Sequence, residues 1–427
     1  MGASEDSKWQ SEKLEAICAQ ITDGKHGDCQ DEPNSGFYFA SCKDVANGKL
    51  NYESARQITE ADFLDTHRRT KFAPSDVLIT NSGTIGRMAL APDNELTRRT
   101  TFQKSVAILK PIVSRVEPNF LYYALQSDIH RLIEFAGGTA QKNLLLRDLR
   151  AFEVSVPPLP VQRRIAGILS SYDELIENSQ RRIRILEEMA NALYREWFVN
   201  FHFPGHKKLP RVASHFGDIP RGWEVSTLGA QLIALESGKR PKGGIRDVED
   251  GVPSIGAENI NGIGRHDFDI EKFVAREFFQ EMRRGIVRDR DVAIYKDGAY
   301  IGKSSYFRDG FPHSECCVNE HVFLLRANGV RLRQNALYLW LHEPDTVHAI
   351  RATNANAAQP GINQQSVGGL KVIVPDENTA AHFDRLVEPL LAEIINLAKR
   401  IQNLSKTRDL LLPRLLSGQV NVNTEVS

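Results

Sequence analysis

Hydrophobic residues recur with helical spacing in two long segments of the chain. Within residues 161–200, apolar positions alternate between spacings of four and three residues, and the same alternation recurs from Phe383 to Leu411. A mean spacing of 3.5 residues is typical of a coiled-coil seam. The predicted seams are Ile165, Leu169, Tyr172, Ile176, Ser179, Ile183, Leu186, Ala190, Leu193 and Trp197, and then Phe383, Leu386, Leu390, Ile394, Leu397, Ile401, Leu404 and Leu411. We predict two long helices, the first of about 38 residues and roughly 57 Å. Pro389 is expected to kink or restart the second helix, and Pro413 to end it.

The sequence before each long helix is rich in short β-type segments. Residues 77–80 and 322–325 are examples, and Gly, Asn and Asp turns separate such segments. One helix is predicted within each region, from Asn119 to Ile133 and from Asn335 to Ile350. The pattern therefore predicts two β-rich heads of about 150 residues each.

The chain is an internal repeat with an offset of about 215 residues. Residues 75–79 correspond to 290–294, and residues 119–125 correspond to 335–341. Further matched pairs are Trp9 with Trp223, Leu14 with Leu228, Gly83 with Gly298, Gly86 with Gly302, Gln141 with Gln359, and Pro157 with Pro375. Because the matches keep their order over the whole unit, we interpret the chain as a duplication.

The duplication bears on how the long helices pack. A single amphipathic helix most often packs on its own domain, but two helices placed identically can bury their apolar stripes against each other. The predicted fold class is α+β, with two β-rich domains joined by two long antiparallel coiled-coil helices in a pseudo-two-fold internal repeat. The predicted divisions are a first head at 1–158, a first spacer helix at 159–201, a linker and second head at 202–376, and a second helix with tail at 377–427.

Composition adds modest limits. A chain of 427 residues with 41% hydrophobic and 25% charged residues is ordinary for a globular protein of two domains. The acidic N-terminus has no signal-peptide core, and no apolar run is long enough to span a bilayer, so a cytoplasmic location is expected. Five cysteines without metal-site spacing are expected to be structural thiols.

The formal net charge is zero, which argues mildly against nucleic-acid binding. Charge is nevertheless segregated, because residues 1–65 contain 6 Lys and Arg against 13 Asp and Glu, whereas residues 66–150 contain 13 against 7. Phosphate contacts require only a basic face, so this distribution permits DNA binding.

Catalytic motifs are absent from the sequence. It contains no Asp-Pro-Pro-Tyr or Asn-Pro-Pro-Phe tetrapeptide and no H-E-x-x-H. The nearest match to a phosphate-binding loop, residues 298–304, has three residues between its glycines instead of four, and its counterpart at 83–87 lacks the Ser or Thr that binds magnesium. A glycine turn with a cation fits backbone or phosphate contacts better than nucleotide hydrolysis. His26, His202, His206 and His342 are widely separated, and no metal site or catalytic residue is predicted.

The remaining polar signals lie in loops that recur in both halves. Arg, Lys, Asn and Gln in such loops are the side chains that bind base edges and phosphates, although each alone is more often a solvated loop residue. The candidate DNA-binding residues are Lys25, His26, Asn81, Thr84, Arg87, Arg98, Arg99, Gln103, Lys104, Gln141, Lys142 and Asn143 in the first half, and Lys239, Arg240, Lys242, Lys296, Tyr300, Lys303, Asn319, Gln359 and Asn363 in the second. The loops differ between the halves while the framework persists, which favours two heads that read two different sequences.

Nearly the whole chain resembles the specificity subunits of type I restriction–modification enzymes. Residues 193–198, 411–418, 157–162 and 407–409 resemble the conserved spacer regions of that family, and residues 21–63 and 235–279 resemble its target-recognition domains. The resemblance implies a non-catalytic subunit that reads double-stranded DNA at two half-sites separated by a fixed spacer. It also implies two methyltransferase subunits and, in the full complex, ATP-dependent restriction subunits, so that S-adenosylmethionine, magnesium and ATP belong to the partners and the chain itself needs no cofactor. The second helix contains Pro389 and lacks the aromatic pair Trp197-Phe198, so the two helices need not contact partners equivalently.

Other functions remain open at this point. A specificity subunit could serve a system with a different modification partner, a bivalent scaffold could bind proteins instead of DNA, and an enzyme without known motifs is a third alternative. DNA binding predicts a steep loss of affinity with salt, which separates it from protein binding. For the DNA-reading alternative we expect each head to dock loops in the major groove, which distinguishes all four base-pair orientations, and the helices to set the distance between half-sites.

Overall fold

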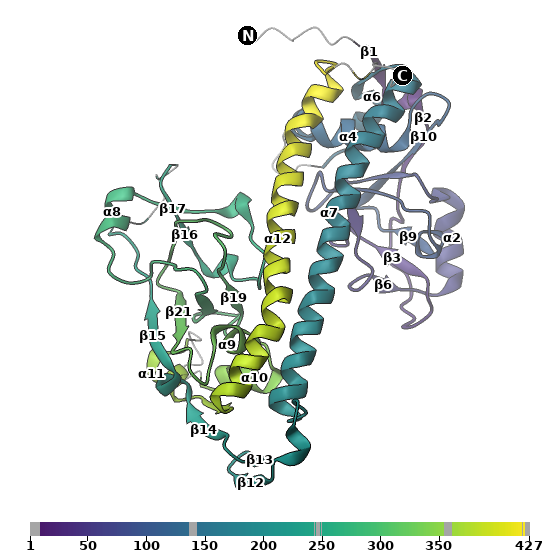
Figure 1. Ribbon diagram of the computed structural model, residues 1–427. Helices are drawn as coiled ribbons and strands as arrows, with labels where there is room; N and C mark the ends of the chain where they lie inside the picture. Colours follow the sequence, from purple (N-terminus) through teal and green to yellow (C-terminus); the bar gives the residue numbers. More distant parts are fainter. Residues whose placement is uncertain are drawn as a thin grey trace, which may run out of the picture. The chain divides into compact units, whose positions relative to one another are not determined.

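The computed structural model describes residues 9–135, 143–242, 244, 248, 250–353, 361–420 and 422 (Figure 1). The chain divides into two compact units, of which unit 1 comprises residues 1–174 and 404–427 and unit 2 comprises residues 175–403. Each unit thus contains one head together with a stretch of both long helices. The predicted divisions at 158, 201 and 376 separate heads from helices, and this finer division stays a prediction. Among the described residues, no helix combines the length and the apolar character needed to cross a bilayer.

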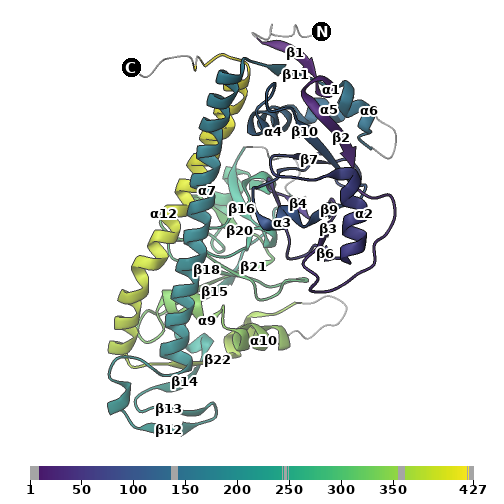
Figure 2. The ribbon, with the colours of Figure 1, turned by 90° about the vertical axis from the view of Figure 1, so that its right-hand side faces the viewer.

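Unit 1 is built on a four-stranded antiparallel sheet in the order β2-β10-β7-β8 (Figure 2). These strands are β2 (Cys18–Asp23), β10 (Val106–Pro111), β7 (Val77–Thr80) and β8 (Met88–Leu90). Side chains alternate between two apolar clusters, with Val77 and Ile79 in one and Leu78 in the other. Because successive side chains of a strand point to opposite faces, this sheet is buried on both sides, which explains why its central strands are continuously apolar.

Smaller sheets and short helices complete unit 1. The strand β3 (Tyr38–Ala40) pairs in parallel with β9 (Thr100–Phe102) and antiparallel with β6 (Arg56–Gln57). The chain also forms β1 (Gln10–Lys13) paired with β11 (Glu153–Val156), and β4 (Val45–Ala46) paired with β5 (Lys49–Leu50). The helices are α1 (Leu14–Ile17), α2 (Glu60–Thr70), α3 (Glu95–Arg98), α4 (Pro118–Ser127), α5 (Ile129–Phe135) and α6 (Leu146–Ala151).

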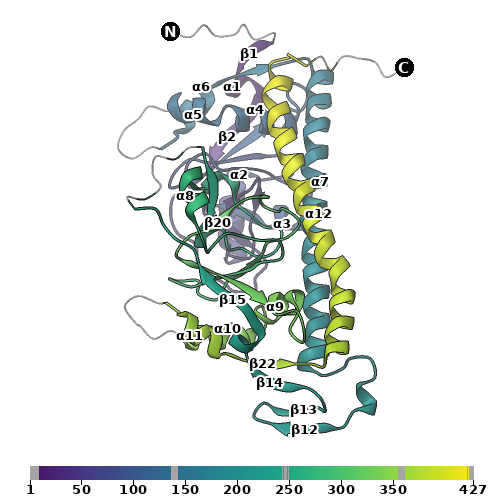
Figure 3. The same cartoon turned by 60° about the vertical axis from the view of Figure 1, so that its left-hand side comes forward.

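Unit 2 repeats this plan (Figure 3). Its four-stranded sheet has the order β15 (Leu232–Ser237), β21 (Val322–Ala327), β18 (Val292–Tyr295) and β19 (Ser304–Tyr306), and its three-stranded sheet has the order β17 (Phe273–Val274), β16 (Val252–Ile255) and β20 (Cys317–Val318). Two pairs, β14 (Glu224–Thr227) with β22 (Lys371–Val374) and β12 (Arg211–Ser214) with β13 (Gly217–Pro220), complete the strands. The helices are α8 (Arg276–Glu281), α9 (Gln334–Trp340), α10 (Pro344–Ala352) and α11 (Gln364–Gly369), with 3-10 turns η2 (His206–Lys208), η3 (Leu228–Gln231), η4 (Ala257–Asn259) and η5 (Phe268–Ile270).

The internal repeat is confirmed at the level of individual turns. Ser75 and its counterpart Arg290 both have a left-handed backbone, with φ of 72° and 66°. The next residue in each repeat is an aspartate whose Oδ2 accepts a backbone N–H three residues upstream, at 2.9 Å for Asp76 and 2.8 Å for Asp291. The strand orders and the parallel pairing of β16 with β20 also match unit 1. The two heads therefore share one scaffold.

The long helices are α7 (Leu159–Tyr194), which continues as a π-helical turn η1 (Arg195–Val199), and α12 (Glu377–Leu416). They lie side by side in opposite directions (Figures 2 and 3), as predicted, and they pack on each other within both units. In unit 1 Ile165 and Leu169 share an apolar cluster with Leu415. In unit 2 the rings of Trp197 and Phe383 lie 5.4 Å apart.

Two details of the helix predictions were wrong, because α12 neither restarts at Pro389 nor ends at Pro413. Both Pro389 and Pro413 lie inside the continuous helix α12, because packing of buried neighbours on either side outweighs the backbone hydrogen bond that each proline removes. The helix ends at Leu416, and Gly418 follows in a left-handed conformation (φ 72°) with its N–H bonded to Leu415 O. The seam of α12 is also shifted near its start: Val387 and Leu391 are buried, whereas Leu386 is 41% exposed.

The helix predicted within each head is interrupted in both. In unit 1 it consists of α4 and α5, which are divided at Asp128, the C-cap of α4. In unit 2 it consists of α9 and α10, and Pro344 is the first residue of α10. A proline suits the first turn of a helix, because the N–H that it lacks would have no partner within the helix there.

Polar networks fix each head to a long helix of its own unit. In unit 2 the carboxylate of Glu388 on α12 accepts hydrogen bonds from Arg290 and Arg308 at 2.7 Å each and from Asn335 at 2.8 Å. In unit 1 Asp173 on α7 accepts from Tyr123 and Arg408 at 2.5 Å each. These charge-assisted contacts orient the heads on the helices.

Candidate nucleic-acid interface

Each head presents a glycine turn with an exposed cation. The turn between β7 and β8 has Gly83 and Gly86 at φ of 76° and 89°, and the turn between β18 and β19 has Gly298 and Gly302 at φ of 109° and 90°. Only glycine adopts such conformations without strain. The turns end on the exposed cations Arg87 and Lys303, and they contain the exposed side chains of Thr84 and Tyr300.

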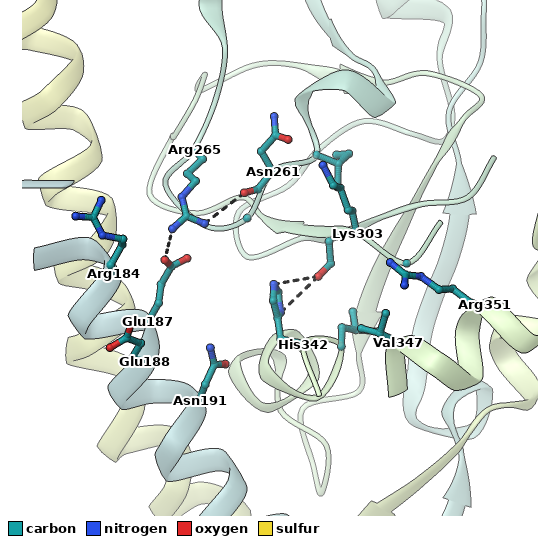
Figure 4. A pocket seen from close by; sticks show the side chains of 15 residues that line it. Arg184, Glu187, Glu188, Asn191, Asn261, Arg265, Lys303, His342, Val347 and Arg351 are labelled. Carbon is teal, nitrogen blue, oxygen red and sulfur yellow. Dashed lines mark hydrogen bonds and ion pairs between the residues drawn. The ribbon is translucent and has the colours of Figure 1, made fainter. Parts of the chain in front are cut away.

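The Lys303 turn borders a pocket of unit 2 with a volume of about 560 Å³ (Figure 4). Its wall combines α7, the loop 260–265, the glycine turn and helix α10. The lining residues are Arg184, Glu187, Glu188, Asn191, Ile260, Asn261, Gly262, Arg265, Gly302, Lys303, Ser304, Leu341, His342, Val347 and Arg351. Four of them are arginine or lysine and two are glutamate, so the pocket has a net positive charge suited to an anionic ligand.

Contacts within this pocket leave part of its charge available. Arg265 reaches across to Glu187 of α7 and forms an ion pair, while Lys303 and Arg351 lie on the side away from α7 (Figure 4). Burial raises the pKa of Glu187 despite that ion pair. Burial lowers the pKa of His342, which favours the neutral ring. The Lys303 ammonium lies 4.5 Å from the centre of the Tyr300 ring.

The Arg87 turn of unit 1 borders a smaller pocket, of about 190 Å³, at the repeat-equivalent place. The pairs Asn47 and Asn261, Gly48 and Gly262, Gly86 and Gly302, Arg87 and Lys303, and Gln126 and His342 line the two pockets at equivalent positions. A pocket bordered by an Asn-Gly pair and a glycine turn with a cation is therefore a property of the shared scaffold.

A second group of predicted residues gathers in unit 1. The backbone N–H of Lys104 donates to Lys25 O at 3.1 Å, Asn81 N–H donates to Ser105 O at 3.0 Å, and Leu144 N–H donates to Asn81 O at 2.9 Å. These bonds bring together the segments that contain Lys25, His26, Asn81, Gln103, Lys104 and Asn143. Four segments distant in sequence thus meet in this head.

Unit 2 gathers the equivalent segments. Lys296 N–H donates to His321 O at 3.0 Å, and Ile362 N–H donates to Lys296 O at 3.0 Å. A Cβ on Gly238 would lie 1.6 Å from Val318 O, so only glycine permits its segment to approach β20 so closely. The segments brought together contain Lys239, Arg240, Lys242, Lys296, Asn319 and Asn363.

Several of these side chains have partners within the chain. Lys25 forms an ion pair with Asp62 at 2.7 Å, Lys296 pairs with Asp297 at 2.5 Å, and His26 contacts Asp23 at 3.0 Å. The Asn319 amide oxygen accepts from His321 N–H, and Asn363 caps α11 by accepting from Ser366 N–H at 2.8 Å. Arg240 lies 3.7 Å from Glu320. Asn81 has a buried Oδ1 to which no described residue donates.

Arg98 and Arg99 lie apart from the other candidates. They precede β9, whereas Gln103 and Lys104 follow it. Arg98 pairs with Asp93, and Arg99 pairs with Glu95 at 3.3 Å. Gln141, Lys142 and Gln359 lie outside the described residues.

The pocket contains functional candidates that the sequence reasoning missed. Arg184, Arg265 and Arg351 come from three segments that only the fold brings together. The repeated Asn-Gly dipeptides at 47–48 and 261–262 are a sequence signal that could have located both pockets. His202 and His206 also proved closer than expected, with ring centres 5.3 Å apart.

Comparison with known proteins places this fold in context. Residues 7–188 match the family described as "Type I restriction modification DNA specificity domain". The type I restriction enzyme MjaIX specificity subunit of Methanocaldococcus jannaschii is 26% identical over 388 residues, which cover 89% of this chain and 86% of that protein. The HindI specificity subunit of Haemophilus influenzae is 20% identical over 97% of this chain and 100% of its own length.

A solved structure shares the fold. The crystal structure of a type I restriction–modification system S subunit from M. genitalium covers 97% of this chain and 98% of its own, with a TM-score of 0.59 and 20% identity. The domain match in the first half and relatives that align across both halves agree with the duplicated architecture. The chain is thus similar to the specificity subunits of type I restriction enzymes over most of its length, and residues 7–188 match their DNA specificity domain.

Proposed function

We propose that this chain is the DNA-reading subunit of a type I restriction–modification complex. Each head reads one half-site of a bipartite target, and the paired helices α7 and α12 set the gap between the half-sites. The chain performs no chemistry itself. It directs two methyltransferase subunits and, in the full complex, ATP-dependent restriction subunits, which hold S-adenosylmethionine, magnesium and ATP. Such a role locates the chain in the compartment that contains DNA.

The observation that carries this proposal is the duplication of the scaffold with unlike loops. Both heads have the same strand order, the same glycine turn and an equivalent pocket beside an exposed cation. The polar residues around them differ, for example Gln103 and Lys104 against Asn319 and Glu320. A constant framework suits sequence-independent contacts to phosphates, and variable loops suit recognition of different bases.

We assign roles to the candidate residues on this basis. Arg87 and Lys303 hold backbone phosphates, together with the missed pocket residues Arg184 and Arg351. Loop side chains read base edges in the major groove, and those paired within the chain exchange their partners for DNA. The loop candidates are Lys25, His26, Asn81, Thr84, Gln103, Lys104, Gln141, Lys142 and Asn143 in unit 1, and Lys239, Arg240, Lys242, Lys296, Tyr300, Asn319, Gln359 and Asn363 in unit 2. Arg98 and Arg99 are retained as candidates at a separate place.

A head exchange tests the proposal. The chain is produced in cells with its methyltransferase partner, and methylated adenines are mapped across the genome before and after residues 1–150 are replaced by the equivalent head of another family member. One half-site should change while the other half-site and the gap remain. If both half-sites stayed as they were, the assignment of one half-site to each head would be wrong.

The phosphate role has its own test. Arg87→Ala and Lys303→Ala should each weaken binding of the methyltransferase complex to target and unrelated DNA by a similar factor. Loss of one phosphate contact should reduce the slope of log affinity against log salt by about 0.9. Lys207→Ala, which removes an exposed lysine away from these loops, is the control. An unchanged salt slope in both turn variants would exclude phosphate contacts by these residues.

A further inference from the structure

Two histidines and a glutamate converge inside the second head. His266 and Glu271 flank the turn η5, and His313 lies in the loop between β19 and β20. The His266 Nε2 atom lies 2.5 Å from Glu271 Oε1, and His313 Nε2 contacts the same oxygen. The three ligand atoms lie within 4.8 Å of one another, and the two imidazole rings are perpendicular with centres 5.6 Å apart.

The cluster is shielded from solvent. The side chains of His266, Glu271 and His313 are 1%, 11% and 25% exposed. The ring of Phe268 packs edge-on against both imidazoles, with centroids at 4.6 and 5.8 Å. Among the described residues, no lysine or arginine forms an ion pair with Glu271. A carboxylate in such surroundings requires a cation, since buried charges are paired or coordinate metals.

The cation that pairs with Glu271 is either a proton on an imidazole or a metal ion bound by the two rings. The neutral ring carries a lone pair, which is the form that binds a metal. A divalent ion would neutralise Glu271 without requiring a charged imidazole.

We propose that His266, Glu271 and His313 form a binding site for a zinc-type divalent ion. Two imidazole nitrogens and one carboxylate oxygen are a known zinc ligand set that leaves a fourth position for water. Tetrahedral coordination at about 2.0–2.1 Å separates ligand atoms by about 3.3 Å. The ion therefore enters as the carboxylate and the rings part by less than about 1 Å, a small adjustment for side chains carried on two loops.

The site is specific to the second head. No other group of three potential ligands occurs among the described residues, so the described part of unit 1 has no counterpart of this cluster. The ion would join the segment 266–271 to the loop at His313, which leads directly into β20 and the recognition segment at Asn319. If the chain has the proposed function, the bound ion stiffens the recognition surface of the second head and leaves that of the first head unaffected.

Metal binding is tested on the purified full-length chain without DNA, so its outcome is independent of the DNA-reading role. After treatment with chelator, the chain is titrated with Zn²⁺ against a chromophoric competitor, and bound zinc is quantified by mass spectrometry. We expect one ion per chain and at least tenfold weaker binding in His313→Ala and Glu271→Gln. His348→Ala removes an exposed histidine of the same unit and should bind zinc like the parent.

Spectroscopy and stability provide further readouts. Co²⁺ should give the visible absorption of a tetrahedral complex in the parent chain and not in either ligand variant. Zn²⁺ should raise the Tm of the parent and of His348→Ala but not of Glu271→Gln, whose near-identical shape keeps the fold intact. A parent chain that binds no zinc, or ligand variants that bind it as tightly as the parent, would overturn the proposal and leave a hydrogen-bonded His–Glu–His cluster.

Discussion

The spacer role of α7 and α12 can be tested by lengthening both helices. The boundary between the compact units falls after Glu174 in α7 and after Asn403 in α12, so four residues inserted at both points separate the segments that pack on the two heads. At a rise of about 1.5 Å per residue, the insertion adds about 6 Å. This equals roughly two base-pair steps of about 3.4 Å.

Rotation must be considered together with length. Four residues turn an α-helix by about 400°, which leaves a net rotation of about 40°. Two base pairs turn the DNA by about 70°, because one turn contains about 10 to 10.5 base pairs. The remaining difference of about 30° is distributed over flexible side chains and DNA twist. A four-residue insertion is therefore the shortest one that nearly preserves the facing of the heads.

The assay is the methylated-adenine map from cells that produce the variant with its methyltransferase. Both half-sites should be unchanged, and the gap should be longer by about two base pairs. An insertion in α7 alone is the control, because it lengthens one helix without the other, so that α7 and α12 cannot keep their register in both units, and it should destabilise the chain without a defined new gap. A double-insertion variant that methylates the original spacing would refute the reasoning.

Three further predictions concern the scaffold. Glu388→Gln should cost about 3 kcal/mol of unfolding free energy in urea melts, because it leaves Arg308, whose side chain is 1% exposed, with the more exposed Asp309 as its remaining charge partner. Burial opposes ionisation of Glu388, but three hydrogen bonds outweigh this effect and lower the pKa of Glu388 to about 2. The contribution of Glu388 to the unfolding free energy should therefore be complete above pH 4.5 and be lost as the pH falls toward 2. Acid melts in which the parent and the variant lose stability equally would contradict this. Phe383→Ala should cost about 3 to 5 kcal/mol in thermal melts and Leu386→Ala less than about 1 kcal/mol, so equal losses would contradict the observed seam. Gly238→Ala places a Cβ 1.6 Å from a carbonyl oxygen of β20 and should lower the Tm of unit 2, and a Tm equal to that of the parent would show that the segment can move away.

The sequence predicted the duplication, the α+β class and the helix pair because these features leave periodic signals. Strands such as β7 and β18 are short apolar runs bounded by turns, and the seam of α7 follows its heptad closely. The seam of α12 was predicted less well. Leu386 and Leu390 fit the spacing, but Val387 and Leu391 are the fully buried residues, while Leu390 is partly buried and Leu386 is exposed.

The candidate sites depend more strongly on tertiary structure. Arg184 and Arg265 are 81 residues apart in the sequence. They line the same pocket only because α7 packs against the second head. His266 and His313 are likewise distant until β16 and β20 pair in parallel and bring their loops together. Residues in loops also have no periodicity, so a sequence can indicate which loops are polar but not which side chains already have partners, as Lys25 has in Asp62.

The composition of unit 1 has a consequence for synthesis. Its apolar cluster includes Leu415 and Val422, which belong to a segment translated long after the rest of that unit. Because a chain leaves the ribosome from its N-terminus, unit 2 has every one of its core residues available before unit 1 does. The head that is made first is therefore completed last, and the apolar residues of α7 in unit 1 lack their partners until the C-terminal part of α12 has been made.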